Sequence, residues 1–183
     1  MHTVQSTDCG RPHSKKLLIV IDMQQDFVYG PLGTEQARAI VARTREKVAS
    51  HEGELWFTLD THGEDYLESA EGRSLPVEHC IKGTEGHALI EELQELALRG
   101  TLFEKPTFGS VQMAQALQGR QDITCVELVG VCTDICVISN ALLLKAFRPE
   151  LSISVDSTCC AGTTPTNHDA SLIAMKSCQI AVV

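Results

Sequence analysis

The segment LLIVID, residues 17–22, decides the fold class of this chain. It is a continuous apolar run that ends in an acid, which is typical of a strand buried on both faces of a parallel sheet. ELWFTLD at residues 54–60 and TCVELVGV at residues 124–131 have the same character. Such runs predict a sheet with helices covering both of its faces.

Helical patterns alternate with these apolar runs along the chain. We expect helices at residues 34–50, 86–98, 110–117, 136–147 and 164–176, and further strands at residues 101–104, 151–157 and 179–183. The glycines and the proline of residues 62–83 predict a long irregular connection without elements of its own. The alternation predicts an α/β fold, a three-layer α/β/α sandwich around a mostly parallel, six-stranded, Rossmann-like sheet.

Composition limits the class of protein. The 183 residues are 43% hydrophobic, which suits one compact domain, expected at residues 16–183 after a disordered tail at residues 1–15. We expect a soluble, cytoplasmic protein, because no apolar stretch approaches the ~20 residues that cross a bilayer and the first residues are polar. The net charge of −9 argues against nucleic-acid binding. Most of the eight cysteines lie in apolar runs, so free thiols are expected.

The predicted topology brings reactive side chains to one edge of the sheet. Ligands bind beyond the carboxyl ends of the strands in open α/β sheets. The predicted strand ends deliver an acid, an acid–histidine pair, a lysine and a cysteine, namely Asp22, Asp60 with His62, Lys105 and Cys136. Because these residues share one edge of the sheet, we expect them to form a single catalytic pocket.

Cys136 is the candidate nucleophile. It lies at the expected start of a helix, where the macrodipole favours a thiolate and lowers the thiol pKa. Lys105 would add a positive charge, and Asp22 could accept the thiol proton as a general base. Backbone N–H groups of the turn at residues 131–136 could bind the oxyanion that forms when a thiolate attacks an amide.

A metal site is predicted beside the cysteine. Asp60 and His62 are two residues apart, so their side chains point to the same side of an extended chain. Glu71 and His79 follow in the long connection. Nitrogen and oxygen ligands of this kind suit Zn²⁺, with Mn²⁺ or Fe²⁺ as alternatives. Three other histidines are interpreted as surface or capping residues, namely His51, His87 and His168.

The motifs resemble those of the isochorismatase-like cysteine hydrolases, and within them the nicotinamidases, over residues 17–183. The most specific are IDMQQDF (21–27), LDTH (59–62), LPVEHCIKGTEG (75–86), EKPTFGS (104–110) and GVCTDICV (130–137). The resemblance implies a catalytic triad of Asp22, Lys105 and Cys136. It implies metal ligands Asp60, His62, Glu71 and His79, among which Glu71 competes with Glu64, Asp65 and Glu68 nearby.

The resemblance also implies an activity, the conversion of nicotinamide to nicotinic acid and ammonia through a Cys136 thioester, as in NAD salvage. The substrate ring nitrogen would bind the metal, and Phe27 and Phe108 would enclose the ring. A non-proline cis peptide between Val131 and Cys132 would aim the N–H groups of Cys132 and Cys136 at the oxyanion. Leu75 stands where many relatives have an aromatic residue. The family habit implies a homodimer or homotetramer.

Two other readings remain open. Related amidohydrolases act on carbamoyl or ureido compounds with the same triad, generally without the metal ligands, whereas an isochorismatase proper would lack the cysteine. A non-enzymatic thiol sensor could use Cys132, Cys136 or the adjacent Cys159 and Cys160. Loss of ammonia release in a Cys136→Ala variant would separate the amidohydrolases from the sensor.

Overall fold

The computed structural model describes residues 14–183, and the sheet in it is the predicted one. Its six strands are all parallel, in the order β3-β2-β1-β4-β5-β6. The strands are β1 (Lys15–Ile21), β2 (Glu54–Asp60), β3 (Thr101–Lys105), β4 (Ile123–Val131), β5 (Ser152–Ala161) and β6 (Ala181–Val182). The tail predicted at residues 1–15 falls outside the described residues except for Ser14 and Lys15, and Lys15 already pairs in β1.

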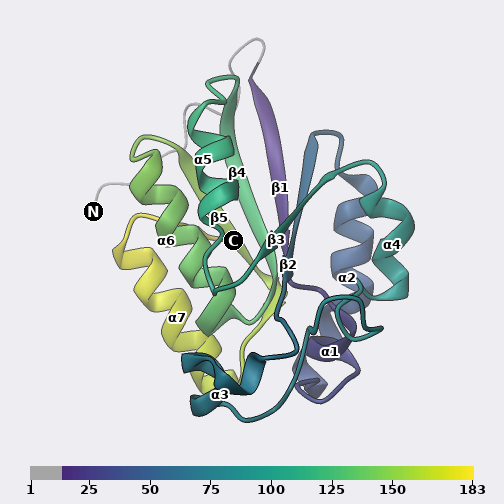
Figure 1. Cartoon of the computed structure of the whole chain (residues 1–183). Helices are drawn as coiled ribbons and strands as arrows, with labels where there is room; N and C mark the ends of the chain where they lie inside the picture. Colours follow the sequence, from purple (N-terminus) through teal and green to yellow (C-terminus); the bar gives the residue numbers. More distant parts are fainter. Residues whose placement is uncertain (1–13) are drawn as a thin grey trace.

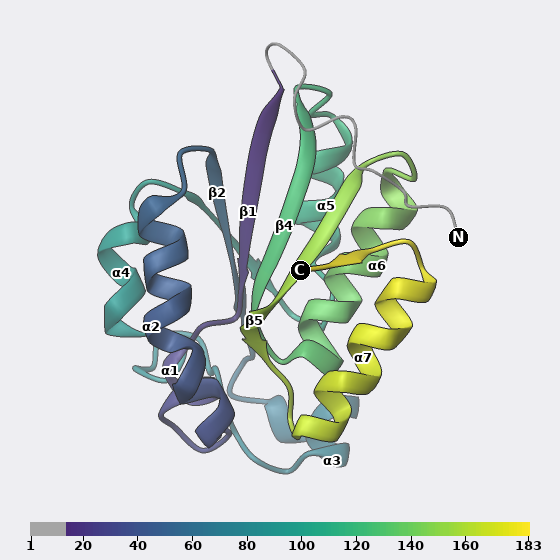
Figure 2. The same ribbon diagram turned by 180° about the vertical axis from the view of Figure 1, so that it is seen from behind.

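Helices cover both faces of the sheet, as Figures 1 and 2 show from opposite sides. One face carries α5 (Val111–Gln118), α6 (Ile138–Phe147) and α7 (Pro165–Ser177), and the other carries α1 (Gln25–Val28), α2 (Glu35–Ser50) and α4 (Glu91–Ala97). The central strand β1 supplies both cores. Leu17, Ile19 and Ile21 face the α5, α6 and α7 layer, while Leu18 and Val20 face the α2 and α4 layer. This alternation explains why the run is apolar at every position.

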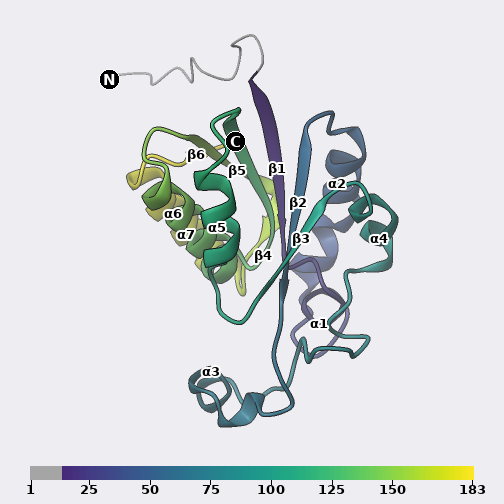
Figure 3. The same cartoon turned by 45° about the horizontal axis from the view of Figure 1, so that its top comes forward.

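Residues 62–83 contain short helices, so the prediction of an irregular connection was wrong in part. The 3₁₀ helix η1 (Tyr66–Glu68) leads into α3 (Ala70–Ser74), and the hydroxyl of Ser69 caps α3 by accepting a hydrogen bond from the Gly72 N–H. Helices this short have too few residues to show a period of apolar positions. Figure 3 shows α3 set apart from the other helices, beyond the end of the sheet.

The turn that carries Cys136 also differs from the prediction. The helix expected from Cys136 is preceded by a π-helical turn, η2 (Thr133–Val137), and α6 starts only at Ile138. The expected cis peptide between Val131 and Cys132 is present. Single π-helical turns are rare and occur frequently at functional sites. Cys136 therefore lies inside an irregular turn rather than on the first residue of a regular helix.

Smaller differences concern element ends and cysteines. The helix expected at residues 86–98 begins only at Glu91, α1 was not predicted, and β5 extends to Ala161. Six cysteines are free thiols, as expected: Cys80, Cys132, Cys136, Cys159, Cys160 and Cys178. Cys125 takes part in a disulfide, so the expectation was wrong there. Within residues 14–183, no helix is both long enough and apolar enough to cross a membrane.

Candidate active site

The structure brings the three predicted catalytic side chains into contact. The Lys105 Nζ lies 2.7 Å from the Asp22 Oδ2 and 3.4 Å from the Cys136 Sγ. Asp22 follows β1, Lys105 ends β3, and Cys136 lies in η2, so the carboxyl ends of three strands meet here. All three residues are buried. The arrangement places a thiol, an amine and a carboxylate within one hydrogen-bonded cluster.

The carboxylate of Asp22 is held by the neighbouring strand. The Thr58 hydroxyl donates a 2.6 Å hydrogen bond to the Asp22 Oδ1, and the Asp22 N–H donates to the same hydroxyl oxygen at 3.2 Å. The backbone of Asp22 lies in the left-handed region, at a φ of 49°, which aspartate adopts more readily than most residues. Thr58 and the backbone turn therefore fix which way this carboxylate points.

Burial and the neighbouring charges together set the pKa values of the cluster. Burial raises the pKa of Asp22, against the lowering effect of Lys105. Burial alone would lower the pKa of Lys105, but the charges of Asp22, Cys136 and Asp60 outweigh it, and the net pKa is raised. Burial and then the Asp22 charge raise the pKa of Cys136 well above its usual value, and Lys105 offsets only part of this. The lowered Cys136 pKa expected from a helix N-terminus is therefore wrong.

Four potential metal ligands converge beside the cluster. Asp60, His62, Glu71 and His79 each present one ligand atom, and the four atoms lie within 4.8 Å of one another. The His62 Nε2 lies 3.0 Å from the Asp60 Oδ2 and 3.9 Å from the Glu71 Oε1. The His79 Nε2 lies 3.6 Å and 3.8 Å from the same two oxygens. We call these four residues the metal quartet.

The quartet fits a divalent cation. The His79 Nδ1 lies 2.8 Å from the Val77 carbonyl oxygen, and a ring N–H donated there leaves the Nε2 lone pair facing the quartet. Burial and the Asp60 charge raise the pKa of Glu71, which shows that the two carboxylates repel each other. Two imidazoles and two carboxylates suit Zn²⁺, Mn²⁺ or Fe²⁺.

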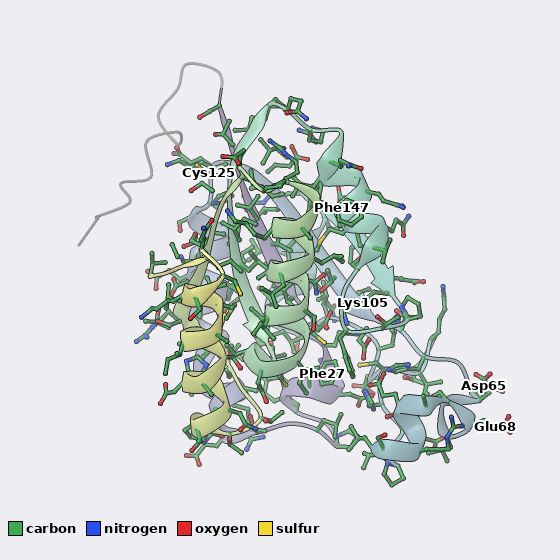
Figure 4. The ribbon with its side chains drawn as sticks, turned by 90° about the vertical axis from the view of Figure 1, so that its left-hand side faces the viewer. Phe27, Asp65, Glu68, Lys105, Cys125 and Phe147 are labelled. Atoms are coloured by element: carbon green, nitrogen blue, oxygen red, sulfur yellow. The ribbon has the colours of Figure 1, made fainter. Side chains whose placement is uncertain are left out.

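The competing acids of the long connection are not in the quartet. Glu64, Asp65 and Glu68 are exposed. Figure 4 shows Asp65 and Glu68 at the outer rim of the α3 segment, away from Lys105 and Phe27. Helix α3 carries Glu71 in its first turn, and the predicted choice of Glu71 over its neighbours agrees with this geometry.

A buried glutamine anchors the end of β2. The Gln24 Oε1 accepts a 2.7 Å hydrogen bond from the Asp60 N–H, and the Gln24 Nε2 donates to the carbonyl oxygens of Asp60 at 2.9 Å and His87 at 2.8 Å. Both backbone groups of Asp60 are thus held by one side chain. Asp60 also lies 3.1 Å from the Lys105 Nζ, so this anchor positions both the quartet and the lysine.

A buried asparagine plays the same part on the nucleophile side. The Asn140 Nδ2 donates to the Cys136 carbonyl oxygen at 2.8 Å and to the Phe108 carbonyl oxygen at 3.0 Å. Its Oδ1 accepts a 2.8 Å hydrogen bond from the Ser110 N–H at the start of α5. Asn140 therefore ties the turn that carries the sulfur to the loop that carries Phe108.

Cys136 and three members of the quartet, Asp60, Glu71 and His79, line one cavity of about 740 Å³. Phe27 and Phe108 both line it, as expected of residues that would enclose a ring. The Phe27 ring centroid lies 5.4 Å from that of His79, while Phe108 is largely exposed. The complete lining is Phe27, Leu32, Thr34, Asp60, Ala70, Glu71, Ser74, Leu75, His79, Thr107, Phe108, Cys132, Ile135, Cys136 and Thr163.

Comparisons with known proteins identify the family of this chain. The isochorismatase domain model matches residues 16–183. The chain belongs to the isochorismatase family. A Bacillus subtilis (strain 168) protein described as an uncharacterized isochorismatase family protein, PncA, is 34% identical over 152 residues, which cover 73% of this chain and 81% of that protein.

Solved structures of the isochorismatase family share its fold. A crystal structure of nicotinamidase/pyrazinamidase PncA from Bacillus subtilis matches with a TM-score of 0.78 at 29% identity, over 92% of this chain and 99% of the other. A Pyrococcus horikoshii pyrazinamidase in complex with zinc matches with a TM-score of 0.79 at 25% identity, over 92% and 98% of the two chains. This chain is thus an isochorismatase-family hydrolase with nicotinamidases among its relatives.

Some residues of this family member escaped the sequence analysis. Thr58, Gln24 and Asn140 act through hydrogen bonds across the fold, and no local pattern reveals such partners. Two histidines interpreted as surface or capping residues make defined contacts instead: the His168 Nδ1 lies 2.8 Å from the Thr133 Oγ1, and the His87 Nε2 lies 2.8 Å from the Thr61 Oγ1.

Proposed function

We propose that this chain is a metal-dependent amidohydrolase that converts nicotinamide to nicotinic acid and ammonia. The observation that carries the proposal is the Lys105 amine, 3.4 Å from the Cys136 sulfur and 2.7 Å from the Asp22 carboxylate, beside the metal quartet. The nicotinamidase and pyrazinamidase relatives support this choice of amide.

In the first half of the reaction, the Cys136 sulfur attacks the carboxamide carbon while Asp22 accepts the thiol proton. A raised Cys136 pKa suits this order, because the proton leaves only as the sulfur bonds to carbon. The backbone N–H groups of Cys132 and Cys136 bind the oxyanion. The C–N bond then breaks, Asp22 passes its proton to the leaving nitrogen, and ammonia departs from a Cys136 thioester.

In the second half, water attacks the thioester and Asp22 accepts a proton from it. Collapse of the second tetrahedral intermediate breaks the C–S bond, Asp22 returns its proton to the sulfur, and the thiol is restored as nicotinic acid is released. Lys105 keeps its positive charge throughout, since its pKa is raised, and holds the carboxylate and sulfur in register. The buried setting strengthens these charge interactions.

Asp60, His62, Glu71 and His79 would hold a divalent metal ion, which would supply Lewis-acid chemistry and a coordination position for the ring nitrogen. Zn²⁺ is the proposed ion because the ligands are two imidazoles and two carboxylates and because a relative binds zinc. Three of the four side chains, Asp60, Glu71 and His79, also line the cavity. We extend the proposal to a cytoplasmic enzyme of NAD salvage that forms dimers or tetramers.

The other readings have less support. Cys159 and Cys160 are both buried and do not line the cavity, which does not favour a thiol pair that senses its surroundings. The complete quartet disfavours the carbamoyl-directed branch, for which no metal set was expected.

The test is ammonia release from nicotinamide by the zinc-loaded chain, by its Cys136→Ala variant and by a Cys178→Ala control, in which an exposed free thiol outside the cavity is removed. We expect turnover in the native chain and in the control, and none in Cys136→Ala. Hydroxylamine should intercept the Cys136 thioester, which would release the acyl group as a hydroxamic acid and restore the thiol. Turnover that survives Cys136→Ala, or a carbamoyl compound hydrolysed in preference to nicotinamide, would contradict the proposal.

A further inference from the structure

The cavity is larger than the proposed reaction requires. Pockets of roughly 300–1,000 Å³ hold drug-sized ligands, and the cavity beside Cys136 measures about 740 Å³. A pyridine ring with one carboxamide is much smaller than such a ligand. The cavity therefore has room for a larger substrate than nicotinamide.

Exposure divides the lining into a floor and a mouth. At the floor, Cys136 is 4% exposed and Asp60 and His79 are each 2% exposed. At the mouth, Leu75 is 37% exposed and Phe108 is 42% exposed. The reacting groups thus lie at the closed end, and large apolar side chains surround the open end. Exposed apolar side chains gathered around a cavity commonly mark a binding surface.

Among residues 14–183, the cavity mouth has no charged side chain that could recognise a charged substituent. The charged and metal-binding groups of the described lining, Asp60, Glu71 and His79, belong to the quartet, and no lysine or arginine is among the residues that line the cavity. A phosphate would find no cationic partner there. The remaining lining combines hydroxyl-bearing residues and Cys132 with apolar residues, which are Phe27, Leu32, Ala70, Leu75, Phe108 and Ile135.

We propose that this enzyme takes aromatic amides that carry an apolar substituent on the ring, and that the outer cavity around Leu75 and Phe108 is the subsite for it. The inference rests on the proposed function. The carboxamide carbon lies at Cys136 and the ring nitrogen points toward Asp60 and His79. The ring nitrogen and the ring carbon that bears the carboxamide therefore both face the floor. Carbon 5 of the ring is opposite them, so a substituent there extends to the mouth.

The expected size of the effect follows from burial. One buried methylene contributes about 0.8 kcal/mol, or roughly a fourfold gain in affinity. A 5-propyl group that is only partly covered should still bind at least about tenfold more tightly than the unsubstituted ring. The reaction itself is unchanged: water is consumed, and ammonia and the substituted acid are released.

The experiment compares nicotinamide with 5-propylnicotinamide in two measurements on the zinc-loaded chain. Dissociation constants are measured calorimetrically on Cys136→Ala, which needs no turnover, and kcat/KM is measured on the native chain. We expect 5-propylnicotinamide to be favoured at least about tenfold in both. Leu75→Trp, which fills the outer cavity, should bring the ratio close to one, and Leu98→Trp, on an 85% exposed leucine outside the cavity, should not change it.

The outcomes separate the two claims. If nicotinamide is bound and hydrolysed while the propyl derivative is equal or weaker, the outer subsite is wrong and the proposed function stands. If the native chain releases ammonia from neither amide, the proposed function is wrong. The affinities measured on Cys136→Ala then test the outer subsite independently of turnover. If the propyl derivative binds no more tightly than nicotinamide, the outer subsite is wrong.

Discussion

The side-chain amide of Gln24 hydrogen-bonds to both backbone groups of Asp60, at 2.7 Å and 2.9 Å. Gln24 follows β1 and Asp60 ends β2, so the contact joins the carboxyl ends of two neighbouring strands. Asp60 is a member of the quartet, where it contacts His62, and it also contacts Lys105. By holding the backbone of Asp60, the Gln24 side chain positions both the metal quartet and Lys105.

Replacing Gln24 by leucine should weaken both stability and metal binding. The change leaves the buried N–H and carbonyl groups of Asp60 without these partners, which costs about 1–3 kcal/mol for each unsatisfied group. Thermal unfolding and zinc titration measure the two effects. Gln118→Leu, at an exposed position in α5, is the matched control and should change neither. Unaltered zinc affinity in Gln24→Leu would contradict the positioning role.

The alkylation of Cys136 should depend steeply on pH. Burial and the Asp22 charge raise its pKa, so the thiolate is scarce at neutral pH and the alkylation rate should rise about tenfold per pH unit while the pH stays below the pKa. Lys105→Met removes the charge that favours the thiolate and should slow alkylation further at every such pH. Peptide mass spectrometry distinguishes Cys136 from the exposed Cys178.

An internal control accompanies this measurement. Cys178 is exposed, and its alkylation in the same sample should be the same in the native chain and in Lys105→Met. Equal Cys136 rates in the two proteins would show that Lys105 does not stabilise the thiolate.

Removal of one quartet histidine should weaken metal binding strongly while the protein stays folded. Loss of an outer partner of a metal ligand already costs about 10–100-fold in affinity, so His62→Ala, which removes a ligand, should cost more than about 100-fold. Metal analysis after dialysis measures the content, and unfolding in the presence of a chelator measures the fold. His51→Ala, at the end of α2, is the control. Native zinc content in His62→Ala would exclude His62 as a ligand.

Asn140 should matter for the chemical step, although it does not line the cavity. Asn140→Leu keeps the approximate volume but removes the hydrogen bonds to the carbonyl groups of Cys136 and Phe108. A displacement of about 1 Å between nucleophile and substrate costs roughly 100-fold, so kcat/KM for nicotinamide should fall about 10–100-fold. Asn140→Asp, which retains only the acceptor for Ser110, should not restore it. The neighbouring Ser139→Ala is the control, and equal activity in Asn140→Leu would contradict the assignment.

The sheet and the candidate catalytic residues could be predicted from the sequence because both follow from patterns. The run at residues 17–22 is apolar at every position before its terminal acid since its side chains enter two cores, and that acid had to lie at the carboxyl edge. Lys105, Asp60 and Cys136 were reached by the same reasoning about strand ends. Glu71 came from the motif resemblance, and the geometry of α3 agrees with it.

The remaining features depend on tertiary contacts. The pKa of Cys136 could not be obtained from its place in the sequence, because complete burial outweighs the helix terminus and Lys105. Asn140 and Gln24 appear in the sequence as ordinary polar residues, and only the folded chain shows which carbonyl groups they meet. Short helices such as α3 likewise escape periodicity.

Helix α3 links two properties that would otherwise be independent. It carries Glu71, and the N–H of Leu75, the residue that ends it, hydrogen-bonds to the Glu71 carbonyl oxygen at 2.8 Å. An ion bound by Glu71 would therefore restrain the backbone that presents Leu75 to the cavity. In that case metal occupancy would also change the shape that the cavity offers to an incoming molecule.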